Sequence, residues 1–242
     1  MQRARHIQIL LISAVSLACC LVRPVAAGIN LSWNDCGAFG TSSTPLTCTS
    51  NNGSLLMIVS ATPTVTLGQA LTQETVIDVV TSGATLSPWW DMRASGGCRP
   101  TSLSSAYSFA PLSNCADPWS GQALGGFDYS IAPILDGPSG IDARIRSVCA
   151  LPAFAPVVLE AGIEYYMCEI VINKKKTVGL GSCAGCTDDA TFTLNSVKIS
   201  QPDGAPNGNP TYTTPDNGVV IMTNGPTPTL NRAWGKVKAL YR

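Results

Sequence analysis

The sequence predicts an all-β protein, an antiparallel two-sheet sandwich of the jelly-roll or immunoglobulin-like kind with a short C-terminal helix. Three observations favour this class. Short segments rich in β-branched residues alternate in hydrophobicity and are separated by turns of Gly, Pro, Asn and Asp. No segment before residue 230 has sustained helical periodicity. The cysteines are numerous for the length, as in disulfide-bonded exported domains.

Residues 1–27 have the pattern of a secretory signal peptide. Arg3 and Arg5 supply a positive start, residues 7–22 supply an apolar stretch, and Val25-Ala26-Ala27 offers small residues before a cut at Gly28. The apolar stretch is short for a membrane span. We therefore expect a protein that is secreted to the extracellular space, the periplasm or the cell surface, with no membrane span after cleavage.

Cleavage there would restrict the chemistry of the remaining chain. The 15 basic side chains fall to 12 when Arg3, Arg5 and Arg23 leave, against 15 acidic ones. Nucleic acid is excluded as a partner, because phosphates require clustered Lys and Arg. The single histidine, His6, leaves as well. Without it the chain builds neither a Ser-His-Asp nor a Cys-His catalytic set, nor an imidazole metal site, and we expect no cofactor.

Residues 28–224 are predicted to form the β-sandwich domain. In its first half, residues 29–33 are an expected strand, residues 54–61 (SLLMIVSA) form an apolar run typical of a buried strand, and residues 74–82 (ETVIDVVTS) alternate. Weaker strands are expected at residues 104–109 and 127–131.

The second half contains the best-patterned strands. Residues 142–151 alternate, with Cys149 on the apolar face and the arginines on the other. Residues 165–173 likewise place Cys168 on an apolar face. After the basic turn Lys174-Lys175-Lys176, a second strand changes phase near Asn195-Ser196, which indicates a β-bulge.

The C-terminal part differs in composition. Residues 201–218 (QPDGAPNGNPTYTTPDNG) predict a long surface loop, and residues 219–223 one more strand. Residues 225–242 read as a linker and a tail helix, because Trp234, Val237 and Leu240 recur at helical spacing among basic residues.

Eight cysteines follow the signal segment, and an even number in an exported chain favours disulfides. Sequence alone leaves the connectivity open. Local spacing suggests four pairs: Cys36–Cys48, Cys98–Cys115, Cys149–Cys168 and Cys183–Cys186. Zinc held by Cys98, Cys115, Cys183 and Cys186 is the alternative, but only one of those pairs has zinc-like spacing.

Two features near residue 185 invite chemical hypotheses. Cys183-Ala184-Gly185-Cys186 has the spacing of a thiol oxidoreductase, but the helix that normally follows such a motif is missing, so a structural disulfide is favoured. Asp188 and Asp189 are weak calcium candidates, since the spacing of a calcium loop is absent.

Aromatic and acidic residues supply two further hypotheses. Trp89, Trp90 and Trp119 could stack on sugar rings, with core packing as the default interpretation. A glycosidase would need two carboxylates at a set separation across a cleft. The candidates for such a pair are Asp128, Asp142, Glu160, Glu164 and Glu169.

Three segments resemble a family of uncharacterised, signal-peptide-bearing bacterial proteins: Trp33-Asn34-Asp35-Cys36-Gly37, Ser182-Cys183-Ala184-Gly185-Cys186-Thr187-Asp188, and Trp234-Gly235-Lys236-Val237-Lys238-Ala239-Leu240-Tyr241-Arg242. The resemblance implies an exported bacterial protein and no particular activity. It also implies that relatives often carry a further Cys a few residues after the CxxC motif, near position 191. This chain has Thr191 there and carries Cys168 instead, which puts the partner of Cys168 in question.

These observations together predict a secreted or cell-surface, non-enzymatic β-sandwich that acts as a structural or ligand-binding module. An extracellular glycan, bound through Trp89, Trp90 and Trp119, and an envelope component are the candidate partners. A carboxylate-dependent glycoside-active enzyme and an envelope thiol oxidoreductase remain as alternatives. The lack of histidine after residue 27 argues against enzymatic activity.

Overall fold

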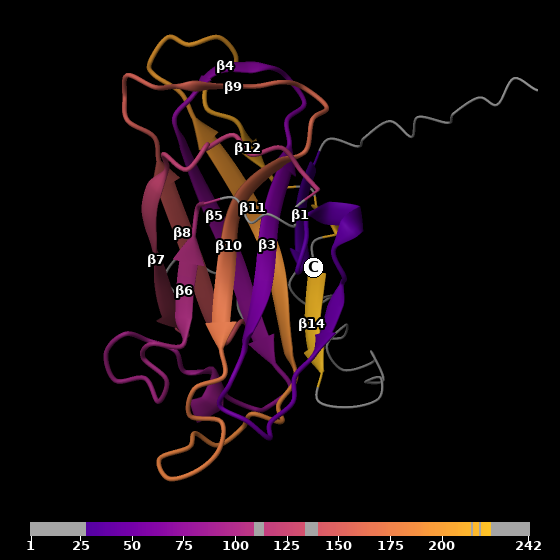
Figure 1. Ribbon diagram of the computed structural model, residues 1–242, viewed down its shortest axis with the longest axis vertical. Helices are drawn as coiled ribbons and strands as arrows, with labels where there is room; N and C mark the ends of the chain where they lie inside the picture. The colour runs from indigo at the N-terminus through magenta and orange to yellow at the C-terminus, as the bar shows by residue number, and fades with distance from the viewer. Residues whose placement is uncertain (1–27, 109–113, 134–139, 214, 218, 224–242) are drawn as a thin grey trace, which may run out of the picture.

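A computed structural model of the 242-residue chain describes residues 28–108, 114–133, 140–213, 215–217 and 219–223. These residues form two facing β-sheets and a small two-stranded ribbon at one end (Figure 1). The strands are β1 (Gly28–Trp33), β2 (Ser43–Pro45), β3 (Ser54–Thr62), β4 (Leu67–Ala70), β5 (Thr72–Thr81), β6 (Leu103–Ala106), β7 (Leu124–Ile131), β8 (Ala143–Ala150), β9 (Val157–Leu159), β10 (Tyr165–Asn173), β11 (Ala190–Ser200), β12 (Thr211–Tyr212), β13 (Pro215–Asn217) and β14 (Val219–Thr223).

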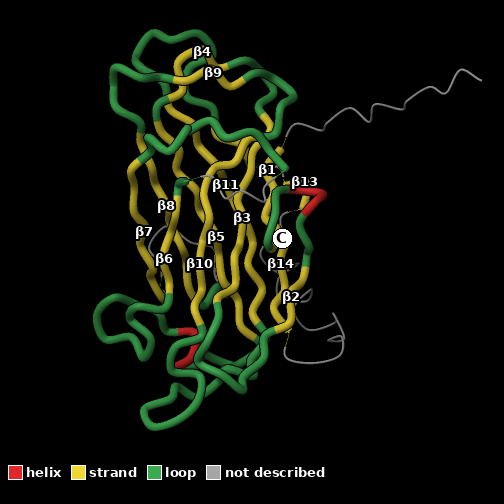
Figure 2. Tube along the Cα trace, viewed as in Figure 1, coloured by secondary structure: helices red, strands yellow, loops and turns green. Residues whose placement is uncertain are grey.

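The two main sheets confirm the predicted antiparallel sandwich. One has five strands in the order β13-β1-β3-β10-β6, and the other has the order β2-β14-β11-β5-β8-β7 with β12 beside β11. Among the described strands, the short edge pairs β1–β13 and β2–β14 are parallel and the other pairs are antiparallel. The ribbon pairs β4 with β9, and long loops gather at both ends of the sandwich (Figure 2).

The core lies between the sheets and follows from the alternation of the strands. Ile29, Leu31 and Trp33 of β1 are fully buried, and so are their partners on β3. Trp33 meets Phe192 of the opposite sheet edge-on, with ring centroids 5.9 Å apart. Aromatic contacts of this kind stabilise the packing beyond the area they bury.

The predicted β-bulge in β11 is confirmed. The register with β5 shifts between Leu194 and Ser196. The residue between them, Asn195, donates a hydrogen bond to Asp78. Asp78 also pairs with Arg144, Oδ1 to Nε at 2.7 Å. The bulge therefore adds a third member to a buried ion pair.

Five short strands were not expected from the sequence. β2, β4, β9, β12 and β13 are two to four residues long, too short to show a hydrophobic period. The last two lie in the predicted loop 201–218. Pro88–Trp90 and Gly37–Phe39 form single 3₁₀ turns, η2 and η1. The predicted signal segment 1–27 and the tail helix in 225–242 lie outside the described residues.

The predicted disulfide pairs are all wrong. The bonds are Cys36–Cys115, Cys48–Cys186 and Cys98–Cys183, while Cys149 and Cys168 are buried and free. Local spacing misled because the sandwich brings together loops that are 79 to 138 residues apart in the chain. Such bonds are typical of proteins in oxidising compartments.

Candidate functional site

The tryptophans proposed for sugar stacking are core residues. Trp89, Trp90 and Trp119 have no exposed surface. Their indole N–H groups donate to Thr177 Oγ1 at 3.1 Å, to the carbonyl of Asp188 at 3.0 Å and to the carbonyl of Met167 at 3.0 Å, respectively. None of these three tryptophans offers a face to a ligand, so the sequence hypothesis of a stacking platform is wrong.

Trp89 instead helps to fix the loops at the lower end of the sandwich. The buried guanidinium of Arg99 lies 3.5 Å from the centroid of the Trp89 ring. It donates hydrogen bonds to the carbonyls of Trp89, Asn173 and Lys175. Burial lowers the pKa of Arg99 to about 9, which still leaves it protonated at neutral pH. This cation therefore joins three loop segments and is not free to bind a substrate.

The Cys183–Cys186 motif does not form its own disulfide. Cys183 bonds to Cys98 and Cys186 to Cys48, so the motif anchors two distant loops. This corrects the predicted local staple and removes the geometry of a CxxC oxidoreductase. The two free thiols do not replace it, because burial raises the pKa of Cys149 and of Cys168 to about 12. A thiolate is the reactive form.

The weak calcium candidates contribute backbone contacts to the same loop. The carbonyl of Asp188 accepts from Trp90, and the carbonyl of Asp189 accepts from the amide of Ser82 at 2.8 Å. Within the described part of the chain, no three His, Cys, Asp or Glu side chains gather as metal ligands would. The structure thus offers no calcium site there.

The carboxylates proposed for glycoside chemistry lie on different parts of the fold. Glu169 pairs with Ile58 on the outer face of the five-stranded sheet, whereas Asp128 pairs with Arg146 on the outer face of the other sheet. Asp142 accepts from the amide and hydroxyl of Thr81 at 2.6 and 2.8 Å. These three carboxylates therefore do not face one another across a shared cleft.

The feature that remains is one end of the molecule, which we call the cap: residues 63–71, 151–164 and 201–210. It contains the β4–β9 ribbon and the loops beside it, at the top of Figure 1. Three of its own side chains, Leu67, Ala70 and Leu159, are fully buried. These apolar contacts attach the ribbon to the sandwich core.

Hydrogen bonds join the cap segments to one another. Gln201 is buried, accepts from the amide of Gln69 at 3.0 Å and donates to the carbonyls of Pro206 and Gly208 at 2.8 and 2.7 Å. Asn207 donates to the carbonyl of Thr66 at 2.8 Å. The cap is therefore a pre-formed surface and not a set of independent loops.

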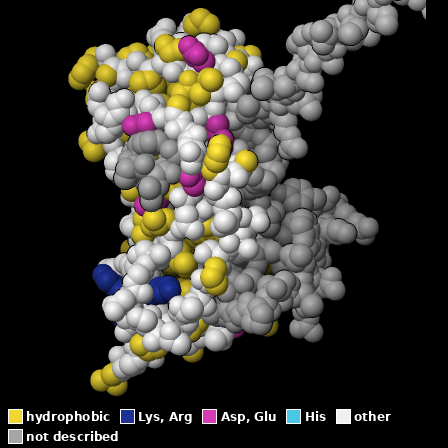
Figure 3. All heavy atoms as spheres, turned by 45° about the vertical axis from the view of Figure 1, so that its right-hand side comes forward, with side chains coloured by type: hydrophobic (Ala, Val, Ile, Leu, Met, Phe, Trp, Pro, Cys, Tyr) yellow, Lys and Arg dark blue, Asp and Glu magenta, His cyan; other side chains and the backbone are white. Residues whose placement is uncertain are grey.

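Apolar side chains point outward from this surface. The exposed fractions are 88% for Phe154, 55% for Val158, 42% for Ile163 and 39% for Val65. Val65 and Ile163 come from neighbouring loops, since the amide of Gly162 donates to the carbonyl of Pro63 at 3.0 Å. In Figure 3 hydrophobic side chains gather at this end. Exposed apolar clusters of this kind mark interaction sites.

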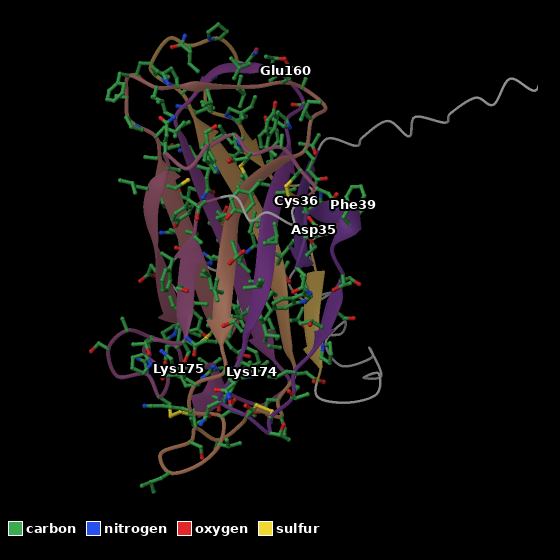
Figure 4. All side chains as sticks on the ribbon, viewed as in Figure 1. Asp35, Cys36, Phe39, Glu160, Lys174 and Lys175 are labelled. Carbon is green, nitrogen blue, oxygen red and sulfur yellow. A yellow bond between two sulfur atoms is a disulfide. The ribbon has the colours of Figure 1, made fainter. Side chains whose placement is uncertain are left out.

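The charge of the cap has one sign. It carries Glu160, Glu164 and Asp203 and no Lys or Arg. The basic residue nearest to it along the chain, Lys198, lies on β11, opposite Glu74 in the register with β5. The basic turn with Lys174 and Lys175 lies at the opposite end from Glu160 (Figure 4). The acidic residues of the cap and the basic turn thus lie at opposite ends of the molecule.

Sequence reasoning missed the cap. The segments 63–66, 151–156 and 160–164 read as ordinary loops, and an exposed Phe in a loop carries no periodic signal. The available clue was Phe154 between Ala153 and Ala155, within a segment bounded by Pro152 and Pro156. An aromatic residue in such a loop must either pack inward or remain exposed.

Comparison with known proteins leaves the family open. No family model matches the chain, and no curated protein matches it, so the resemblance described above stays a prediction. Among solved structures, a chain from a crystal structure of a complex of CaDoc0917 with CaCohA2 is 7% identical, with a TM-score of 0.34, and the match covers 81% of this chain and 99% of that one.

The second type II cohesin module of the adaptor ScaA scaffoldin from Acetivibrio cellulolyticus is 10% identical, with a TM-score of 0.30, over 86% of this chain and 96% of that one. Likenesses this weak carry no argument about what the chain binds. Within the described residues, no helix is long and apolar enough to cross a membrane.

Proposed function

We propose that this protein is a non-enzymatic binding module that acts outside the cytosol and engages a protein partner through the cap. The observation that carries the proposal is the set of exposed apolar side chains (Phe154, Val158, Ile163 and Val65) on one hydrogen-bonded end of the molecule that has no Lys or Arg. The three disulfides support an oxidising location, and secretion through residues 1–27 would deliver the chain there.

The chemistry of the cap defines the partner. Phe154 and Val158 offer apolar area that a partner would remove from water. Burying a side chain of the size of Phe contributes about 2 kcal/mol, or roughly 30-fold in affinity. The exposed carboxylates of Glu160 and Asp203 favour a partner with Lys or Arg and disfavour an acidic one, whereas the carboxylate of Glu164 accepts hydrogen bonds from Asn30 and Ser60. A glycan is not proposed, since the three tryptophans that would stack on it are buried.

A peptide-display selection tests this role. Random peptides are selected on the purified chain, with counter-selection against Phe154→Asp. We expect enriched peptides that combine aromatic or aliphatic residues with Lys and Arg. Phe39→Asp is the matched control, because Phe39 is also exposed, at 66%, but lies on η1 outside the cap. Peptides that bind wild type and Phe154→Asp equally, or that are acidic, would contradict the proposal.

A further inference from the structure

The chain contains a segment with the chemistry that the cap requires. Residues 230–242 (LNRAWGKVKALYR) carry four basic side chains and no acidic one. Their apolar residues include Trp234, Val237 and Leu240, at the spacing of one helix face. An apolar and basic segment complements an apolar and acidic surface. The tail and the cap therefore match in both hydrophobicity and charge.

The tail begins at the end of the sandwich that is remote from the cap. β14 ends at Thr223, and its Met222 pairs with Ala190 at the start of β11. The cap meets the other end of β11, where the amide of Leu71 donates to the carbonyl of Ser200 at 2.9 Å. Ten residues of strand separate the two ends, which is roughly 33 Å. Lys174 and Lys175 lie at the lower end of the sandwich, the end at which β14 finishes (Figure 4).

The reach of the chain favours the cap of a second copy over the chain's own cap. From Thr223 to Leu230 the chain spans at most about 25 Å. A helix from Leu230 adds only about 6 Å by Trp234. At about 31 Å against roughly 33 Å, Trp234 would reach its own cap only with the linker drawn out to its full length. A second copy is under no such constraint.

We propose that residues 230–242 of one copy dock on the cap of the next, so that the protein associates head to tail. This inference rests on the proposed binding role of the cap and names its partner. The contact is heterologous, with different surfaces on the two copies, so it extends as a chain or closes as a ring. Both complementary surfaces then belong to one sequence.

The first test is a binding titration with a synthetic peptide of residues 228–242. The receptor is the full chain carrying Trp234→Asp and Val237→Asp, so that its own tail does not compete. We expect saturable binding that weakens at least 10-fold when Phe154→Asp and Val158→Asp are added, and that weakens with salt. Leu180→Asp is the control at the opposite end, where Leu180 is fully exposed. A scrambled peptide that binds equally well would overturn the proposal.

The second test is complementation between two variants, followed by sedimentation velocity. The cap variant (Phe154→Asp, Val158→Asp) retains a tail, and the tail variant (Trp234→Asp, Val237→Asp) retains a cap. We expect wild type to associate, each variant to stay monomeric alone, and an equimolar mixture to form heterodimers. Equal urea midpoints would establish that both variants fold. A mixture that remains monomeric, or a tail variant that associates like wild type, refutes the inference.

The outcomes also separate this inference from the function on which it rests. If display selection yields peptides that depend on the cap but the tail peptide does not bind, the cap is a binding face for another protein and the head-to-tail inference fails alone. If neither the selected peptides nor the tail depends on Phe154, both proposals fail.

Discussion

The disulfide connectivity predicts which of two double-cysteine variants loses more free energy of unfolding. Pairing between cysteines that are close in the sequence would predict the opposite order. The three bonds close one covalent ring through the segments 36–48, 98–115 and 183–186. Replacing Cys98 and Cys183 by Ala opens this ring of roughly 30 residues, and chain entropy puts the loss at about 4 kcal/mol. The relevant loop length is that of the ring and not the 85 residues between Cys98 and Cys183 in the sequence. The other two disulfides remain and already shorten the covalent path between these two residues.

Replacing Cys183 and Cys186 instead removes two of the three bonds. The second bond then closes a loop of roughly 80 residues, so the total loss is about 8 kcal/mol. That is close to the whole free energy of unfolding of a typical domain, and we expect this variant to be largely unfolded. With a Cys183–Cys186 bond, the same substitution would open a tight loop worth only about 2 kcal/mol.

Urea unfolding under non-oxidising, non-reducing conditions measures both variants, with near-ultraviolet circular dichroism as the signal. We expect the Cys183/Cys186 variant to be the less stable of the two by several kcal/mol. If it is the more stable one, or if the two variants lose the same free energy, the connectivity described here is wrong.

Three further predictions concern the sandwich itself. Gly125→Ala should destabilise the fold by about 2 kcal/mol or more, because its new Cβ would lie 2.1 Å from the carbonyl oxygen of Val148, while Gly126→Ala, with no atom within 4 Å, should be nearly neutral in the same urea experiment. Cys149 and Cys168 should not react with a maleimide in the native protein and both should react in urea; equal labelling in the two states would show that they are accessible. Because their pKa is raised from 9 to about 12, stability should fall as pH rises from about 9 towards 12, and should show no contribution from these thiols below pH 8. Asp78→Ala should cost about 3 to 5 kcal/mol by leaving Arg144 buried without its carboxylate, and paired Asp78→Leu with Arg144→Met should recover most of that loss, as thermal unfolding would report.

The main strands could be predicted because their side chains alternate, as in β8 and β10, or form a continuous apolar run, as in β3. β10 has the bounds expected from the pattern, and the phase change at Asn195 identified a real bulge. The disulfides could not be predicted in this way. Pairing Cys48 with Cys186 depends on the three-dimensional position of two loops 138 residues apart, which no local spacing encodes.

The candidate site shows the same limit. Trp89 and Trp90 are adjacent, and strand geometry would have exposed one of them. The 3₁₀ turn at Pro88–Trp90 instead buries both. Conversely, Phe154 could be identified only from the structure. It lies in the loop before β9, and the two strands of the β4–β9 ribbon are too short to be detected in the sequence. The predicted function as a non-enzymatic module is retained as a proposal, but its binding surface has moved.

Hydrogen exchange by mass spectrometry on the full chain carrying Trp234→Asp and Val237→Asp, with the peptide of residues 228–242, tests the central claim most directly, because it locates the binding face while the cap stays unmutated. The account predicts that the peptide slows amide exchange in residues 63–71 and 151–164 and leaves the loops around Lys174 unchanged. Protection confined to the lower loops, or no protection at any concentration, would contradict it.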